Sequence, residues 1–427
     1  MSDSKAFIEQ AYNTLKNQPE QVILLHPQSR YRSLLLAKLM NEPAQKSFYY
    51  SLDPDDISVH TLIESLTRNL SGQHALFGRY LNLLPTEVYE RFTHNEEIVM
   101  QTMQQELNAL SDEPFFFLLD EYDRSDESDD IHRFVELLAH YLPPQCKLVL
   151  NGRTLPRLPW IALVAQSRAA ILIDDVLVER DFYGSPSAKE NFELYAYTLG
   201  PGQVRVGDNL IELWEGHLPR LLLFFSLDRP VVTRSEICQA FWPDLDVDQA
   251  VNVFHVTKRR LHKALDRDVL FHNDTHYRVN PAIRLYYDAM DFVERLMEGR
   301  NPNNPNPIES WKKAADLYGG PFLQGHKDKW IIERRAAYRF GYVEALSHVA
   351  DHWIGRERYE MALQQYEKAL AEDYMAENIH RRLIELYAKL GRRSEAVAHY
   401  QAMEKHFQVN KRAISPETAA VYADIVS

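Results

Sequence analysis

Short apolar runs alternate with amphipathic segments through the first 194 residues, and this alternation restricts the fold more than any other feature of the sequence. Five runs are typical of buried strands, at residues 21–25, 46–52, 114–120, 147–152 and 169–174. Segments with helical periodicity separate several of them, at 60–70, 96–110 and 131–141. Strands that alternate with helices pair in parallel and are covered by those helices, so we expect an α/β domain on a parallel sheet.

The rest of the chain shows two further patterns. Residues 195–284 carry short strands, three short helices and a hairpin, whereas residues 285–427 are almost wholly helical in pattern. We therefore predict a multidomain chain with an α/β domain at 1–194, a small mixed domain at 195–284 and an all-α domain at 285–427. The stretch 299–310 is rich in asparagine and proline and is expected to be a loop.

A 34-residue repeat lies near the C-terminus. Ala362 and Tyr366 recur as Ala396 and Tyr400 at this spacing. Thirty-four residues is the period of tetratricopeptide repeats, in which pairs of antiparallel helices stack on their neighbours. A long helix expected over residues 330–354 precedes the two copies. The pattern predicts a TPR-like helical repeat domain.

The segment 248–265 has the pattern of a helix with two different faces. One face is apolar apart from a threonine and consists of Ala250, Phe254, Thr257, Leu261 and Leu265. The opposite face is polar and consists of Asn252, His255, Arg259 and His262. An α-helix fits the major groove of DNA, where such side chains reach base edges and flanking Lys and Arg contact phosphates. Taken alone, the pattern is more typical of a solvated surface helix than of a DNA-binding helix.

The flanking sequence favours DNA binding, because it completes a winged helix-turn-helix. Thr233 and Glu236 form a capping box that begins a short helix over 235–241, and Pro243 ends that helix. Two short strands surround the turn pair Asn273-Asp274 and predict a hairpin, the wing. The residues expected to contact DNA are Arg234, Asn252, His255, Lys258, Arg259, His262, Lys263, His276 and Arg278.

The charge distribution leaves a second class of function open. The chain has a formal net charge of −13, which opposes binding to a polyanion. The window 199–284 is neutral, with eleven Lys and Arg against eleven Asp and Glu. A DNA-binding transcriptional regulator is the first hypothesis. The alternative is a signalling adaptor whose winged-helix and repeat domains bind proteins rather than DNA.

The segment after the first strand lies where nucleotide-binding proteins carry a P-loop. The motif G-x-x-x-x-G-K-[ST] needs glycines so that backbone N–H groups converge on phosphates, and a lysine that neutralises them. The corresponding positions hold His26, Tyr31, Arg32 and Ser33, of which only Ser33 conforms. We expect the Tyr31 side chain to occupy the phosphate space, and Arg32 to keep the charge without the lysine shape.

Other parts of a nucleotide site are recognisable. The strand at 114–120 has the Walker B form and delivers two carboxylates suited to Mg²⁺ and water. The vestigial nucleotide site comprises Arg32, Ser33, Asp120, Glu121 and Arg153. Because this P-loop-like domain lacks an intact P-loop, we expect no ATP hydrolysis and no cofactor, with binding of ATP or ADP as an alternative. The acidic run 120–130 is expected to be a solvated loop, or alternatively a cation site.

The motifs after residue 195 resemble a known family. Three runs resemble the OmpR-type winged helix, in the form found in the SARP family of bacterial pathway activators. They are LGPGQVRVGDNLIEL, VTRSEICQAFWP and LHKAL. YYDAMDFVERL, ADLYGGPFLQGHKDKWIIERR and SPETAAVY are similar to the bacterial transcriptional activator domain that follows it. This resemblance implies promoter binding and recruitment of RNA polymerase through the loop 242–247. His262 departs from it, since the family usually has arginine there.

Residues 20–185 resemble the ATPase domain of the MalT-type branch of STAND signalling proteins. The resemblance rests on YYSLDPDD, LLDEYD, YLPPQCKLVLNGRTLPRLPW and LVERDFY. In larger SARP proteins the ATPase follows the activator domain, whereas here the similar region comes first. The broken P-loop and this reversed order imply a domain retained for protein contacts or dimerisation.

The sequence also indicates a compartment and partners. Two cysteines, a start without signal-peptide features and the absence of a long apolar run predict a cytoplasmic protein without membrane contact. The expected partners are double-stranded DNA and RNA polymerase, with a signalling protein or a second copy of the chain as further alternatives.

Overall fold

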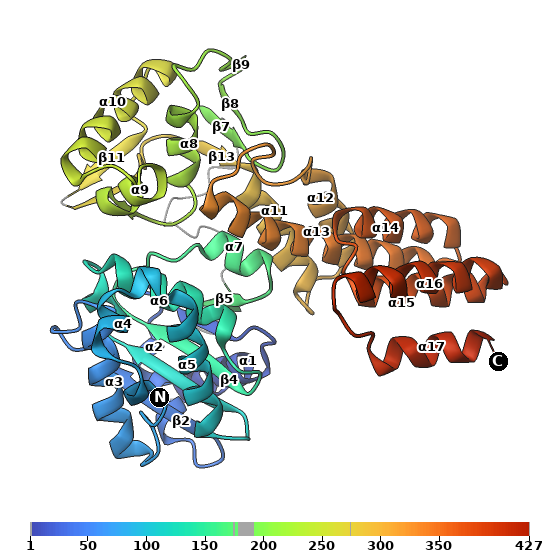
Figure 1. Ribbon diagram of the computed structural model, residues 1–427, viewed down its shortest axis with the longest axis horizontal. Helices are drawn as coiled ribbons and strands as arrows, with labels where there is room; N and C mark the ends of the chain where they lie inside the picture. The colour runs from blue at the N-terminus through green and yellow to red at the C-terminus, as the bar shows by residue number, and fades with distance from the viewer. Residues whose placement is uncertain (1, 174–175, 178–191, 274, 427) are drawn as a thin grey trace. The chain divides into compact units, whose positions relative to one another are not determined.

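The computed structural model describes the chain except for residues 1, 174–175, 178–191, 274 and 427 (Figure 1). The chain divides into two compact units. The first contains residues 1–196 and 203–286, and the second contains residues 197–202 and 287–427. The α/β region and the winged-helix region therefore share the first unit.

The N-terminal region is built on a parallel sheet, as the strand–helix alternation predicts. Its strands are β1 (Val22–Leu25), β2 (Lys46–Ser51), β3 (Phe115–Asp120), β4 (Cys146–Asn151), β5 (Ala169–Ile173) and β6 (Val176–Leu177). They lie in the order β2-β3-β4-β1-β5-β6; the first five run parallel and β6 pairs antiparallel to β5. The carboxyl ends of β1, β3 and β4 consequently meet at one edge of the sheet.

Helices cover both faces of this sheet. They are α1 (Ser2–Asn17), α2 (Arg32–Asn41), α3 (Val59–Gln73), α4 (Thr86–Glu90), α5 (Glu96–Leu110), α6 (Asp129–Tyr141) and α7 (Trp160–Ala165). The helices α1 and α2 pack on one face through Tyr12, Leu35 and neighbouring apolar residues. Successive side chains of β3 point to opposite faces and five of its six residues are buried, so the second face is covered as well. The helices α5 and α6 pack together there (Figure 1).

The winged-helix region contains two small sheets around three helices. The strands β7 (Leu194–Tyr197), β8 (Gln203–Val206), β9 (Asn209–Leu210) and β13 (Leu285–Tyr287) form one sheet. The strands β10 (Val232–Thr233), β11 (Leu270–Asn273) and β12 (His276–Val279) form the other. The helices are α8 (Leu218–Phe225), α9 (Arg234–Phe241) and α10 (Val247–Leu265). The β11–β12 hairpin is the predicted wing, although Asp274 of its turn lies outside the described residues.

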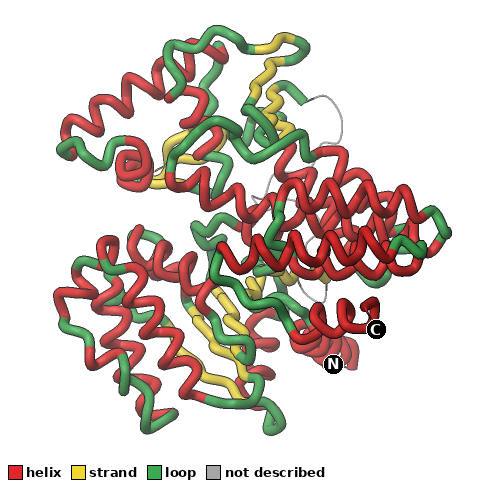
Figure 2. The backbone as a smooth tube through the Cα atoms, turned by 45° about the vertical axis from the view of Figure 1, so that its right-hand side comes forward, coloured by secondary structure: helices red, strands yellow, loops and turns green. Residues whose placement is uncertain are grey.

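Side-by-side helices make up the second unit (Figure 2). They are α11 (Asp288–Arg300), α12 (Pro307–Leu317), α13 (Lys329–Gly355), α14 (Tyr359–Glu372), α15 (Glu377–Lys389), α16 (Arg393–Val409) and α17 (Pro416–Val426). The repeated Ala362, Tyr366, Ala396 and Tyr400 are all buried in one core cluster. The prediction of a loop over 299–310 was wrong at both ends: α11 continues to Arg300, and α12 begins on Pro307, whose missing N–H costs nothing in the first helical turn.

Two histidines meet in the core of the second unit. His380 on α15 is buried, and its Nδ1 lies 2.8 Å from Nε2 of His399 on α16. Nε2 of His380 lies 2.8 Å from the carbonyl oxygen of Tyr374. The Tyr374 carbonyl oxygen accepts a hydrogen bond from His380 Nε2–H; because burial keeps both rings neutral, Nδ1 of His380 accepts a hydrogen bond from Nε2–H of His399.

Acidification should therefore destabilise the second unit. Burial lowers the pKa of His399 to about 4, and it lowers that of His380 as well. The unfolded rings bind protons below about pH 6.5 while the folded rings stay neutral, so the stabilisation is complete above that pH and is lost as the pH falls toward 4. Urea unfolding at a series of pH values should show this loss of stability. The substitution His399→Phe should reduce the pH dependence of the free energy of unfolding between about pH 4.5 and 7. Equal dependence in both proteins would contradict this account.

Candidate nucleic-acid interface

The helix α10 packs one face into the protein, as its sequence pattern predicts. Its N-cap is Asp246, whose side chain accepts a hydrogen bond from the Gln249 N–H at 2.9 Å, and it ends where Asp266 takes a left-handed conformation. The five buried residues of the helix are those of the predicted apolar face, Ala250, Phe254, Thr257, Leu261 and Leu265. They pack it against α8 and α9.

The opposite face of α10 is open to solvent. Asn252, His255, Arg259 and His262 are all exposed, at successive helical turns. Among the described residues, Arg259 has no ion-pair partner. An unpaired guanidinium and a free amide on one exposed helix face are the groups that donate to base edges in a major groove.

The cations beside this face are held in different ways. The ammonium group of Lys258 lies 5.3 Å from the centre of the Tyr277 ring, which orients it beside the wing. Lys263 and Arg260 both pair with Glu215, at 2.5 and 3.4 Å. The ion pair with Lys263 lowers the pKa of Glu215. Lys263 must therefore leave Glu215 before it can contact a phosphate.

The remaining predicted DNA contacts lie on α9 and the wing. The capping box is present, since Thr233 accepts from the Glu236 N–H and Glu236 accepts from the Thr233 N–H. Arg234, the first residue of α9, is exposed. On β12, Arg278 is exposed, whereas His276 is half-buried with its Nε2 3.3 Å from the carbonyl oxygen of Asp126 in the α/β region. The wing therefore already has a protein neighbour.

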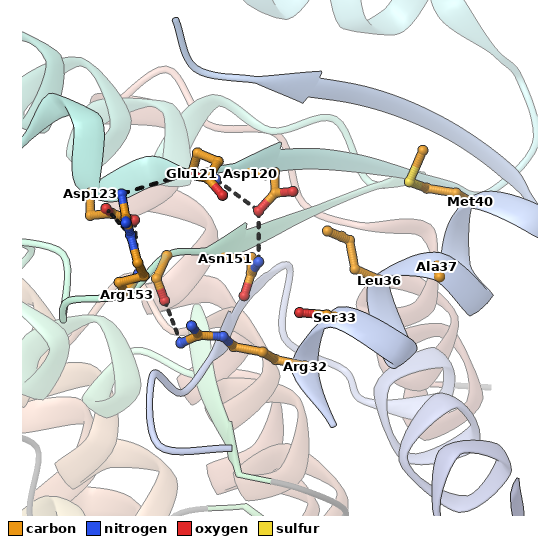
Figure 3. Close-up of a pocket in the computed structure, with 11 residues that line it drawn as sticks. Arg32, Ser33, Leu36, Ala37, Met40, Asp120, Glu121, Asp123, Asn151 and Arg153 are labelled. Carbon is orange, nitrogen blue, oxygen red and sulfur yellow. Dashed lines mark hydrogen bonds and ion pairs between the residues drawn. The ribbon is translucent and has the colours of Figure 1, made fainter. Parts of the chain in front are cut away.

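The vestigial nucleotide site lines a cavity of about 300 Å³ at the carboxyl edge of the large sheet (Figure 3). All five predicted residues, Arg32, Ser33, Asp120, Glu121 and Arg153, line it together with Asn151. Open α/β sheets bind ligands at this edge. The structure therefore brings the predicted residues together at one cavity, and their contacts decide what it can hold.

Those contacts do not fit a magnesium nucleotide. Arg32 Nη1 donates to the carbonyl oxygens of Pro27 and Gly152, at 2.7 and 2.8 Å, and so ties the loop to β4. Asp120 accepts from the Tyr49 hydroxyl, the Asn151 amide and the Glu121 N–H, at 2.9, 2.6 and 2.8 Å. The groups that would meet phosphate and Mg²⁺ are thus bound to protein instead.

Two expectations for this region were wrong. The Tyr31 side chain does not fill the phosphate space, because its ring stacks on Phe7 of α1 with centroids 5.9 Å apart, and its φ of −105° is ordinary. The acidic run 120–130 is not simply a solvated loop, since Tyr122 and Ser125 are buried and a short 3-10 helix spans Tyr122–Ser125. Within the described residues, no group of three or more His, Cys, Asp or Glu is placed to hold a metal ion.

A cluster of buried charges was not anticipated from the sequence. Arg157 lies in the run LPRLPW, and its side chain pairs with Asp129 of α6 and Glu236 of α9, at 3.0 and 2.6 Å. Only 1% of Arg157 is exposed. The one signal in the sequence for a buried charge here is an arginine among apolar residues after a strand. Its ion-pair partners could not be predicted, because they lie far from it in the sequence.

The architecture defines a class of protein: a parallel α/β region, a mixed region of three helices and two small sheets, and stacked helices. Residues 288–425 match the model of the bacterial transcriptional activator domain, so the second unit contains that domain. No protein of curated function matches the chain.

The motif LVERDFY lies mostly outside the described residues. Across the described part of the chain, no helix is both long and apolar enough to cross a membrane.

Two solved structures are similar at low identity. Mycobacterium tuberculosis EmbR, in complex with a low-affinity phosphopeptide, is 19% identical with a TM-score of 0.47, over 55% of this chain and 65% of that chain. A STAND protein with a tetratricopeptide repeat sensor from Pyrococcus horikoshii is 12% identical with a TM-score of 0.26, over 98% of this chain and 66% of that chain. This chain therefore spans just under two thirds of the length of either structure.

Proposed function

We propose that the protein is a sequence-specific DNA-binding transcriptional regulator, and specifically an activator that recruits RNA polymerase. The observation that carries the proposal is the division of α10, whose apolar face is packed while Asn252, His255 and Arg259 remain exposed. In a helix-turn-helix, the second helix lies in the major groove and reads base edges with such side chains. The bacterial transcriptional activator domain at 288–425 supports a role in transcription.

The loop between α9 and α10 is the proposed contact with RNA polymerase. It is exposed and acidic, with Asp244 and Asp246 before α10. Asp246 also caps α10, so its side chain has a structural role, and Asp244 is the residue that is available for a partner. We assign no ATPase activity to the pocket in the α/β region, because Arg32 and Asp120 are bound to protein groups.

Selection of duplexes from a random pool by the full-length protein tests the proposal. We expect an enriched motif, with affinity that falls as salt rises by about one log unit per log of salt for each phosphate contacted. Magnesium ATP should neither change the selected motif nor release phosphate. A pool without enrichment at low salt would contradict DNA recognition, and ATP-dependent binding would contradict the inactive pocket.

A signalling adaptor remains the second candidate, and two observations favour it. The chain has a net charge of −13, and Glu215 pairs with both Lys263 and Arg260 at the edge of the proposed DNA-binding face. In this case the winged helix and the stacked helices would both bind proteins. Absence of DNA enrichment, together with capture of one protein partner that competes with changes on α10, would select this function.

A further inference from the structure

We propose that the acidic start of α6 and a DNA duplex compete for one surface of the winged helix, so that the described arrangement is a DNA-free, self-inhibited state. The inference rests on the proposed function. The surface consists of the N-terminal end of α9 and the adjoining strand β12. Its present occupants are Asp126 and Asp129, together with Arg157 behind them. We call residues 126–129, which Arg157 holds through Asp129, the inhibitory segment.

The first contact is at the start of α9. Both carboxylate oxygens of Asp129 lie 3.0 Å from the hydroxyl of Thr233, the N-cap of α9. In DNA-bound helix-turn-helix proteins, helix N-termini and hydroxyl groups contact backbone phosphates. Asp129 thus places a negatively charged oxygen pair where a phosphate would accept the same hydrogen bond.

The second contact is the wing. Nε2 of His276 lies 3.3 Å from the Asp126 carbonyl oxygen. His276 and Arg278, both predicted to contact DNA, line a cavity of about 300 Å³ together with Asp126, Thr154 and Arg157. A DNA duplex bound to β12 would have to occupy the space of these α/β residues. The wing therefore cannot contact the α/β region and DNA at the same time.

Ion pairs hold the inhibitory segment in place. Arg157 links Asp129 to Glu236, and Arg229 links Glu236 to Glu136 of α6, at 3.1 and 3.5 Å. Glu236 therefore receives one arginine from each side of the contact. Permanent interfaces are mostly apolar and closely packed, whereas this contact contains ion pairs and an open pocket, as do contacts that open.

The exposed face of α10 offers DNA a first binding site before the contact between the α/β region and the winged helix opens. Asn252, His255 and Arg259 are uncovered within this same unit, so a duplex can meet α10 first. Completing the complex through α9 and the wing then requires release of Asp129. The measured affinity of the wild-type protein would include the free energy of that release.

Charge reversal in the full-length chain tests the competition. Asp129→Lys places a cation beside Arg157 and should open the contact, raising affinity for the selected duplex by about tenfold or more. Glu127→Lys is the matched control, because Glu127 is exposed on the same segment and the change in net charge is identical. The control should change affinity by no more than about twofold to threefold. Equal gains in both variants would mean a general charge effect and would overturn the inference.

Hydrogen–deuterium exchange separates failure of the inference from failure of the proposed function. Adding the duplex to wild-type protein should increase deuterium uptake at residues 126–132, and Asp129→Lys should show that uptake without DNA. Tight wild-type binding with unchanged uptake would overturn competition while leaving DNA recognition intact. If Asp129→Lys opens the segment but neither protein selects any duplex, the proposed function is wrong and the competition falls with it.

Discussion

Replacing Arg259 with alanine should erase the preference for one base in the selected motif and weaken specific binding by about 1–3 kcal/mol. Arg259 is exposed at the centre of the polar face of α10 and has no ion-pair partner in the described chain, so its guanidinium is free to donate to a base. A bidentate contact of this kind discriminates between bases because only guanine offers two acceptors in the major groove at the right spacing. Selection with wild-type and variant protein measures the preference directly.

Arg260→Ala is the matched control for this experiment. The residue is also exposed on α10, but its side chain pairs with Glu215 at 3.4 Å. Its loss should lower affinity for all duplexes by a similar factor and leave the motif unchanged, as expected for a group near the backbone. If Arg259→Ala keeps the wild-type motif while binding weakens uniformly, Arg259 contacts phosphate rather than bases.

Replacing Arg157 with alanine should have the largest effect on stability. The side chain is 1% exposed and compensates two carboxylates, Asp129 and Glu236, which would remain with reduced solvation. Removing one member of a buried charge cluster costs about 3–5 kcal/mol, here because Asp129 loses its arginine and Glu236 keeps only Arg229. We expect the unfolding transition of the first unit to move to lower urea concentration, while that of the second unit stays in place.

Arg153→Ala provides the comparison. Arg153 pairs with Asp123 at 2.9 Å, but its side chain is 68% exposed. Exposed ion pairs contribute at most about 1 kcal/mol, so its unfolding curve should stay close to wild type. Similar destabilisation by both substitutions would show that burial of Arg157 is not what makes its ion pairs important.

Features set by neighbouring residues could be predicted from the sequence. The apolar face of α10, the capping box of Thr233 and Glu236, and the five parallel strands of the large sheet all follow from periodicity or short motifs. The residues of the vestigial nucleotide site were also grouped correctly, because the carboxyl ends of parallel strands meet at one edge. Their hydrogen bonds were not predictable, since Arg32 reaches Gly152 across 120 residues of sequence.

Residue periodicity alone indicates which helix has a packed face and a polar face, because side chains three and four residues apart share a face wherever the helix lies. The contact between Asp129 and Thr233, 104 residues further along the chain, is visible only in the folded protein. Nothing in a charge pattern specifies its partner, since the pairing depends on which surfaces the folded chain brings within a few ångströms. The same acidic run that looks solvated in the sequence consequently becomes, in the folded protein, a neighbour of the wing.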